Sequence, residues 1–106
     1  MADDPMWMLV MFDLPVKTKS QVRFANRFRM LLLDSGFSMV QFSIYARYTP
    51  TGGSDVHMLR VIKSNVPPGG KVRVLFLTDR QWSGMAKFSN AVEEEPEKPP
   101  EQLTIF

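Results

Sequence analysis

The stretch WMLVMFDLP, residues 7–15, carries the strongest structural signal in this chain. Its apolar and aromatic run does not alternate with polar residues and ends at Asp13. Such a run is typical of a central strand that is covered on both faces, by helices on one side and by another element or a second subunit on the other. We therefore predict a strand over Met6–Asp13, which delivers the Asp13 carboxylate where the buried sheet meets solvent.

A basic segment follows this carboxylate. Lys17 and Lys19 come first, and Lys19, Arg23 and Arg27 are spaced four apart, so they would form one stripe on a helix. Like charges at this spacing cost roughly 0.2 to 0.5 kcal/mol per pair unless an anion or an acidic partner lies against them. A carboxylate beside cations suggests phosphate binding or phosphate chemistry, and a plain solvated helix face is the alternative.

The charge of the chain is unevenly distributed. We predict one domain over residues 1–92, followed by an acidic Pro/Glu linker and a terminal edge strand over 93–106. The first part holds 12 Lys and Arg against 6 Asp, a net charge of +6, and the second holds 5 Glu and 1 Lys, a net charge of −4. This asymmetry favours a polyanion as partner of the domain.

Several function classes are excluded by what the sequence lacks. There is no Cys, which excludes disulfides, thiolate nucleophiles and cysteine-based zinc sites. No signal peptide and no apolar run of about 18 residues is present, so we expect a soluble cytoplasmic protein without a membrane partner.

The first predicted helix begins at a Thr18 or Ser20 cap, runs to about Ser35 and ends at Gly36. Its expected apolar face consists of Phe24, Phe28, Leu31 and Leu32. The aromatic and β-branched segment 37–50 is too long for one ordinary strand, so we predict two strands that meet near residues 41–43 in a hairpin or bulge.

In the second half of the chain, a helix is again followed by a strand. A helix capped by Ser54 or Asp55 would carry an apolar stripe and stop at PPGG, residues 67–70. KVRVLFLTD, residues 71–79, is predicted to be an interior strand because its apolar core is continuous, and a further short strand is expected within 81–92. The expected apolar stripe of the helix is Val56, Leu59, Ile62 and Val66.

The order strand, helix, strand, strand, helix, strand predicts an α+β fold. It is the ferredoxin-like βαββαβ arrangement, in which a four-stranded antiparallel sheet carries both helices on one face. The bare face needs a cover, and eight Met with Trp7, Tyr45 and Trp82 offer adaptable apolar surface, so we expect a homodimer. The terminal QLTIF, an extra C-terminal strand, would add to a sheet edge of the other protomer or of a partner through Leu103, Ile105 and Phe106; a frayed end is the alternative.

Taken together, three motifs resemble a known family. The strand ending MFDLP, the run Gln41–Tyr45 (Gln-x-Ser-aliphatic-aromatic) and the closing LFLTD resemble the small dimeric proteins of CRISPR adaptation, the non-integrase member of the core adaptation pair. The resemblance covers nearly the whole chain. Phe12 stands where many members carry Tyr, and the PPEQLTIF ending resembles members that accompany type II systems.

This resemblance implies a homodimer that bridges two dimers of the CRISPR integrase and holds a short double-stranded DNA for insertion. Basic residues would contact its phosphates without reading base sequence. By position, the residues implied are Lys17, Lys19, Arg23 and Arg27, with Arg47 and Arg80 as further candidates.

The family is also described as a metal-dependent endonuclease that acts on single-stranded RNA or double-stranded DNA. The resemblance then makes Asp13 of each protomer the catalytic and metal-binding residue, with one Mg²⁺ between the two. A single carboxylate is too few ligands, but two on a two-fold axis would repel each other and favour a divalent cation or a shared proton. Alternatively, Asp13 caps a turn or bonds Lys17.

The remaining candidates have structural interpretations. His57 has no nucleophile as partner and is expected at the surface. Asp79 would bond Arg80 or complete a turn, and Trp82 and Tyr45 are expected in the core or an interface. The favoured function is the scaffold subunit; a stand-alone nuclease is the second hypothesis. An RNA-recognition module is the third, and residues 71–79 lack its Lys/Arg-Gly-aromatic pattern.

Overall fold

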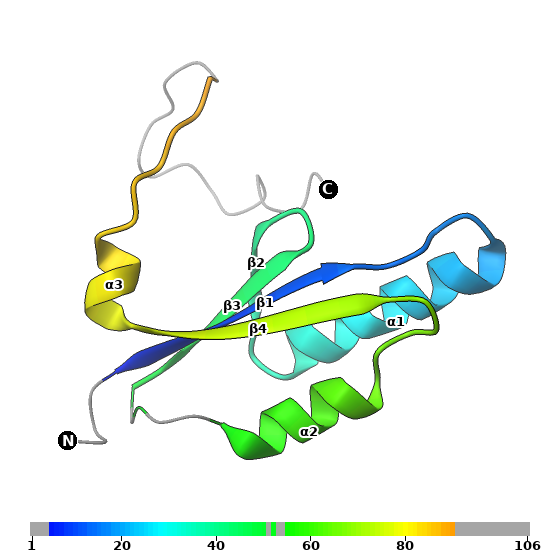
Figure 1. The fold of residues 1–106 in the computed structure, drawn as a ribbon, viewed down its shortest axis with the longest axis horizontal. Helices are drawn as coiled ribbons and strands as arrows, with labels where there is room; N and C mark the ends of the chain where they lie inside the picture. Colours follow the sequence, from blue (N-terminus) through cyan, green and yellow to red (C-terminus); the bar gives the residue numbers. More distant parts are fainter. Residues whose placement is uncertain (1–4, 51, 53–54, 91–106) are drawn as a thin grey trace.

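The computed structural model describes residues 5–50, 52 and 55–90 of the chain (Figure 1). Four strands form one antiparallel sheet in the order β2-β3-β1-β4, and helices α1 and α2 pack on the same side of it. This confirms the predicted α+β ferredoxin-like fold. The elements are β1 (Met6–Asp13), α1 (Lys19–Asp34), β2 (Ser38–Gln41), β3 (Ile44–Thr49), α2 (Val56–Ser64), β4 (Lys71–Thr78) and α3 (Asp79–Ser83).

Strand β1 lies at the centre of the fold, as its sequence predicts. It pairs with β3 on one side and with β4 on the other. Its side chains alternate between the two sheet faces, and Met8, Val10 and Phe12 are buried on the helix side. These three pack with one cluster of helix residues, namely Phe28 and Leu32 of α1 and Met58 and Ile62 of α2.

Both helices begin at the caps that the sequence offers. The Thr18 hydroxyl accepts a hydrogen bond from the Gln21 amide at the start of α1, and the Gln21 side-chain oxygen accepts one from the Thr18 amide. Asp55 caps α2 by accepting from the Met58 amide. Each cap satisfies backbone donors that the helix itself cannot pair.

The predicted apolar face of α1 is wrong at one residue, Phe24, and that of α2 at two, Val56 and Val66, because α2 ends at Ser64, before Val66. Phe24 is 38 % exposed and Val56 is 53 % exposed, whereas Ala25 and Met58 are buried. The inward line of α1 runs through Ala25, Phe28 and Leu32, and that of α2 through Met58 and Ile62, at spacings of three or four residues. Phe24 and Val56 fall outside those lines.

The predicted hairpin is confirmed. Strands β2 and β3 meet at Phe42 and Ser43, and the pairing register shifts between Met39 and Gln41, as a bulge requires. Ser43 has a φ of 64°, in the left-handed region that non-glycine residues seldom occupy. Its carbonyl accepts a hydrogen bond from the Phe12 amide at 3.0 Å, which ties the hairpin to β1.

Two predictions for the C-terminal half are wrong. Strand β4 lies at the edge of the sheet and not in its interior, and Leu75 on it is 46 % exposed. Within residues 81–90 the structure has the short helix α3 in place of the predicted strand, because Thr78 caps a helical turn reciprocally with Gln81. Residues 91–92 and the predicted strand QLTIF lie outside the described residues.

The length and apolar character of the helices bear on whether they could span a membrane. Among the residues that the structure describes, none of the helices is both long and apolar enough to cross a membrane.

Candidate functional site

Asp13 lies on the sheet face that α1 and α2 leave uncovered. It is exposed at the end of β1 and pairs in register with Lys71, the first residue of β4. Two pairs earlier along β1, Met11 stands opposite Arg73. Because paired residues and alternate residues of a strand share a face, Asp13, Lys71 and Arg73 lie together on one side of the sheet. With Met11 and Phe12 they line a hollow of about 370 Å³.

Two glycines bring the ends of β1 and β4 together. Gly69 has a φ of 79°, and a Cβ built on Gly70 would lie 2.6 Å from Leu14 Cδ2 and 3.1 Å from the Pro67 carbonyl oxygen. A side chain at position 70 would therefore displace the Leu14 side chain or the loop before β4. The PPGG segment, predicted only as a turn, ends directly before Lys71, the residue that pairs with Asp13.

The charged side chains of this hollow make no bond to one another. Within residues 5–50, 52 and 55–90, no hydrogen bond or ion pair is formed by the side chain of Asp13, Lys71 or Arg73. The suggested bond between Asp13 and Lys17 is likewise not seen there; the Lys17 amide donates instead to Gln21 Oε1 at 2.8 Å. All three charged side chains are therefore exposed and unpaired among the described residues.

Within the described residues, Asp13 is the one carboxylate that this hollow offers to Mg²⁺. The ion takes about six oxygen ligands in octahedral geometry, of which proteins usually supply one or two carboxylates, and water or substrate phosphates supply the rest. The described part of the chain contains no cluster of three or more His, Cys, Asp or Glu side chains that could hold a metal, and the cations Lys71 and Arg73 lie beside Asp13. In a site with two carboxylates, a second copy of the chain would bring its own Asp13.

The basic stripe of α1 lies in a different part of the molecule. Lys19, Arg23 and Arg27 are exposed on the helix, as predicted, and the Arg27 guanidinium lies 5.7 Å from the centroid of the Phe24 ring. Helix α1 packs on the sheet face opposite to the one that carries Asp13. The structure therefore does not bring the stripe and Asp13 into one cluster. Lys17, in the connection between them, is exposed.

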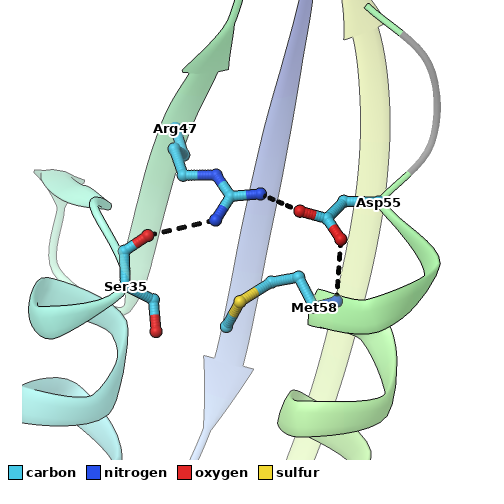
Figure 2. A network of polar contacts seen from close by, with 4 residues as sticks. All are labelled: Ser35, Arg47, Asp55 and Met58. Atoms are coloured by element: carbon cyan, nitrogen blue, oxygen red, sulfur yellow. Dashed lines mark hydrogen bonds and ion pairs between the residues drawn. The ribbon is translucent and has the colours of Figure 1, made fainter.

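Arg47 is tied to its own chain on several sides. Figure 2 shows its guanidinium between the Ser35 carbonyl, which accepts from Nη1 at 3.0 Å, and the Asp55 carboxylate, which pairs with Nη2. It also lies 5.1 Å from the centroid of the Phe37 ring. Arg47 thereby joins the end of α1 to the start of α2, a role that its position in the sequence does not reveal.

The electrostatics of Asp55 follow from this network. The Met58 amide, which donates to Oδ1 at 2.9 Å, is the main reason why the pKa of Asp55 lies below its usual value. The neighbouring Arg47 lowers this pKa further, and partial burial acts in the opposite direction. The fold therefore favours the ionised form of Asp55, which caps α2 and forms an ion pair with Arg47.

An aromatic cluster lies at the opposite end of β1 from Asp13, where the strand begins. The Trp7 ring stacks on Trp82 of α3 with centroids 4.3 Å apart and lies 5.1 Å from Tyr48. Its indole Nε1 donates to Asp79 Oδ1 at 2.9 Å. Asp79 is thus the first residue of α3 and accepts a hydrogen bond from Trp7. The sequence suggested instead a bond to Arg80 or a turn. The stacking explains why α3 folds against the sheet.

The other structural interpretations are confirmed. Tyr45 is buried and packs against Phe12, and burial raises the pKa of its phenol while Arg29 opposes that shift. His57 is exposed on α2. Arg80 is exposed at a hollow that it lines with Pro5, Thr78 and Asp79.

Sequence reasoning missed Lys71 and Arg73. The signal was present, because KVRV alternates charged and apolar residues at the start of a strand, and such alternation places two cations on one face. Their proximity to Asp13 depends on the pairing of β1 with β4, which the linear sequence does not show.

Comparisons with known proteins point to one family. The family model of "CRISPR associated protein Cas2" matches residues 6–85. Proteins named "CRISPR-associated endoribonuclease Cas2" are similar over most of the chain. One from Flavobacterium psychrophilum is 42 % identical over 102 residues, covering 95 % of this chain and 88 % of the relative. One from Paracidovorax avenae is 40 % identical over 95 % and 94 %, and one from Parvibaculum lavamentivorans is 35 % identical over 95 % and 100 % of the two chains.

Proposed function

Because this chain belongs to the CRISPR associated protein Cas2 family, we propose that it acts in CRISPR adaptation as a scaffold subunit. In this role a homodimer binds the phosphate backbone of a short DNA duplex and bridges dimers of the CRISPR integrase. The observation that carries the proposal is the sheet face without α1 or α2, on which partly exposed apolar side chains lead to the charged hollow at Asp13.

The proposed dimer buries that face. The register of β1 and β4 places three apolar side chains on this face, Leu9, Met11 and Leu75. In the single chain, Leu75 is 46 % exposed. Burial of apolar surface contributes about 25 cal/mol per Å², so two such faces in contact would stabilise a small domain substantially. Asp13 at the margin of the face would then approach its counterpart in the second protomer.

The exposed edge of β4 is the place at which we propose that the C-terminal segment adds to the sheet. This eight-residue strand pairs only with β1 in the described chain, although its run VLFL is typical of a strand with neighbours on both sides. Long apolar edges attract further strands. We assign QLTIF of the partner protomer, with Leu103, Ile105 and Phe106, to this edge by strand addition.

The nucleic-acid surface of the proposal is the exposed basic set. Lys17, Lys19, Arg23, Arg27 and Arg80 would contact phosphates, and binding should weaken as salt rises because counterions are released on contact. Arg47 is left out of this set because its guanidinium is bonded to Ser35 and Asp55.

A second candidate is metal-dependent cleavage of single-stranded RNA or double-stranded DNA. It is favoured by the word "endoribonuclease" in the names of the similar proteins and by the exposed carboxylate of Asp13. Since the described residues offer one carboxylate at this hollow, this candidate places the Asp13 side chains of two protomers at a dimer axis, where both would bind the ion. Cleavage by the purified protein that is lost in Asp13→Asn, with its mass in solution unchanged, would support it.

The experiment that tests the scaffold proposal is integration of a short DNA duplex into a repeat-bearing plasmid by the cognate integrase. The reactions contain no second protein, the wild-type chain, or Asp13→Ala. We expect integration to depend on the wild-type chain and to survive in Asp13→Ala. If the wild-type chain adds nothing, the adaptation role is wrong. If only Asp13→Ala fails while its mass equals that of wild type, the carboxylate has a chemical role.

A further inference from the structure

A groove lies between α1 and the connection from α2 to β4. Its volume is about 460 Å³. The apolar walls come from Phe24 and Leu31 of α1 and from Val66, Pro67 and Pro68 of the connection. Because α1 and α2 cover the helix side of the sheet, the groove lies away from the face that the proposed homodimer buries. The homodimer therefore leaves this groove open.

We propose that this groove binds the segment KPPE, residues 98–101, of the partner protomer, and that the bound segment competes with DNA for Arg27. The segment belongs to the acidic Pro/Glu linker of the chain. The inference rests on the proposed function in two respects, the dimer and the DNA contact of the α1 stripe. The groove itself and its occupant are no part of that function.

The charges of the groove match those of the segment. Arg27 and Asp34 both line the groove, and they stand seven residues apart on α1, which is about 10.5 Å along the helix axis. Lys98 and Glu101 are three residues apart, which is about 9 Å in the polyproline II conformation typical of Pro-rich segments. Lys98 beside Asp34 and Glu101 beside Arg27 would thus pair both charges of the groove at once.

Both charged side chains of the groove are exposed, and neither has to give up a bond to bind the segment. Arg27 and Asp34 form no hydrogen bond or ion pair with any described residue. The Arg27 guanidinium lies over the Phe24 ring, 5.7 Å from its centroid. This distinguishes Arg27 from Arg47, whose donors are bonded to Ser35 and Asp55.

The apolar walls of the groove suit the two prolines of the segment. Polyproline II segments are recognised by grooves lined with aromatic side chains. Phe24 is 38 % exposed at the groove, where the sequence predicted a core residue. Leu31 stands between Arg27 and Asp34 on α1, as the prolines at 99 and 100 stand between Lys98 and Glu101. The prolines would therefore cover Leu31 and its neighbours when the end charges are paired.

The position of the groove beside β4 assigns the segment to the partner protomer. Pro67 and Pro68 lead through Gly69 and Gly70 into β4. The segment KPPE directly precedes QLTIF, which the proposed function places on the β4 edge of the partner. A chain that reaches this edge can cross the groove of the same protomer on its way. The two contacts would then hold the linker of one protomer against the other.

The test uses disulfide formation in the full chain, which has no Cys of its own. The test variant is Met30→Cys with Pro99→Cys, because Met30 lines the groove and is 53 % exposed. The matched control is Val22→Cys with Pro99→Cys, since Val22 is exposed on the same helix but does not line the groove. Each single-Cys variant measures the product that forms without the pair. Circular dichroism verifies that every variant keeps the fold.

Under mild oxidation we expect the Met30 pair to give mainly a disulfide-linked dimer on a non-reducing gel, and the Val22 pair to give little. Equal yields from the two pairs would overturn the docking, and a link within one protomer would overturn its assignment to the partner. Arg27→Glu should lower the yield of the Met30 pair, and adding Glu101→Arg should restore it. Failure of the charge exchange to restore the yield would overturn the pairing of these two residues.

The linked Met30 pair also tests the competition with DNA, because its oxidised and reduced forms have the same sequence and the same net charge. Binding of a fluorescent DNA duplex is measured by anisotropy before and after reduction. We expect reduction to raise the affinity several-fold, since it releases Arg27 for a phosphate. Equal affinity of the two forms would overturn the competition and leave the proposed function intact. Absence of DNA binding by the wild type would overturn the DNA contact of the proposed function, while the disulfide yields would still decide whether the segment binds the groove.

Discussion

Two groups of an aspartate with basic residues lie on opposite faces of the sheet and differ in how they are bonded. Arg47 and Asp55, on the helix side, are paired with each other and with the backbone of Ser35 and Met58. Asp13 and Arg73, on the open side, make no such bonds within the described chain. The same residue types therefore stabilise the fold in one place and are unpaired among the described residues in the other, and tertiary placement alone sets the difference.

The largest expected effect is on stability, from loss of Arg47. Arg47→Met leaves the Ser35 carbonyl and the Asp55 carboxylate without their guanidinium partner, which should cost about 2 kcal/mol because the pair is only partly exposed. Arg73→Met should change the free energy of unfolding by less than about 0.5 kcal/mol. Urea denaturation of both variants measures this; equal losses would show that the two arginines do not differ as described.

The next effect concerns the loop that places Lys71 beside Asp13. In Gly70→Ala the new Cβ would lie 2.6 Å from Leu14 Cδ2 and 3.1 Å from the Pro67 carbonyl oxygen, so the Leu14 side chain or the loop must shift, at a cost of about 1 kcal/mol. Gly84→Ala is the matched control, because the nearest atom to its Cβ would be the Arg80 carbonyl oxygen at 3.5 Å. Thermal unfolding compares them, and only Gly70→Ala should be destabilised. A Gly70→Ala variant as stable as Gly84→Ala would contradict the proposed role of the glycine.

Much of the fold could be predicted from the sequence because its signals are local. The apolar run of β1, the Thr18 cap and the alternation around the hairpin each specify their element. The edge position of β4 could not be predicted, since a continuous apolar strand also suits an edge that a second chain covers. The capping box of Thr78 and Gln81 that begins α3 can be read from the sequence and was overlooked, whereas the packing of α3 on Trp7 joins residues far apart in the sequence.

The candidate site could be predicted only in part. The position of Asp13 at an exposed strand end follows from the sequence, and so does the exposed stripe of α1. The proximity of Asp13 to Lys71 depends on pairing between the first and last strands of the sheet. The bonds of Arg47 depend on two helix ends that meet only in the folded chain. The features that could be predicted depend on residues near one another in the sequence, whereas the missed ones depend on residues that meet only in the folded chain.

A smaller effect is the pH dependence that Asp55 confers. Its pKa is lower in the folded chain than in the unfolded one, chiefly through the Met58 amide and then through Arg47. The stability it contributes is therefore present above the unfolded pKa of about 4 and is lost as pH falls through the folded value. Asp55→Asn, which still caps the helix, should flatten this part of the profile. Unfolding free energy measured from about pH 6 to pH 2 tests this, and an unchanged acid slope would contradict it.

The smallest effect is expected for Asp13, the counterpart of Asp55. Without a bonded partner in the described chain, Asp13→Asn should change the free energy of unfolding by less than about 0.5 kcal/mol in the absence of DNA. A double-mutant cycle with Lys71→Gln should give a coupling close to zero for the same reason, although the two residues are paired in register. A coupling as large as that between Arg47 and Asp55 would mean that the hollow is closed by its own ion pair in solution. The contrast between the two faces would then no longer hold.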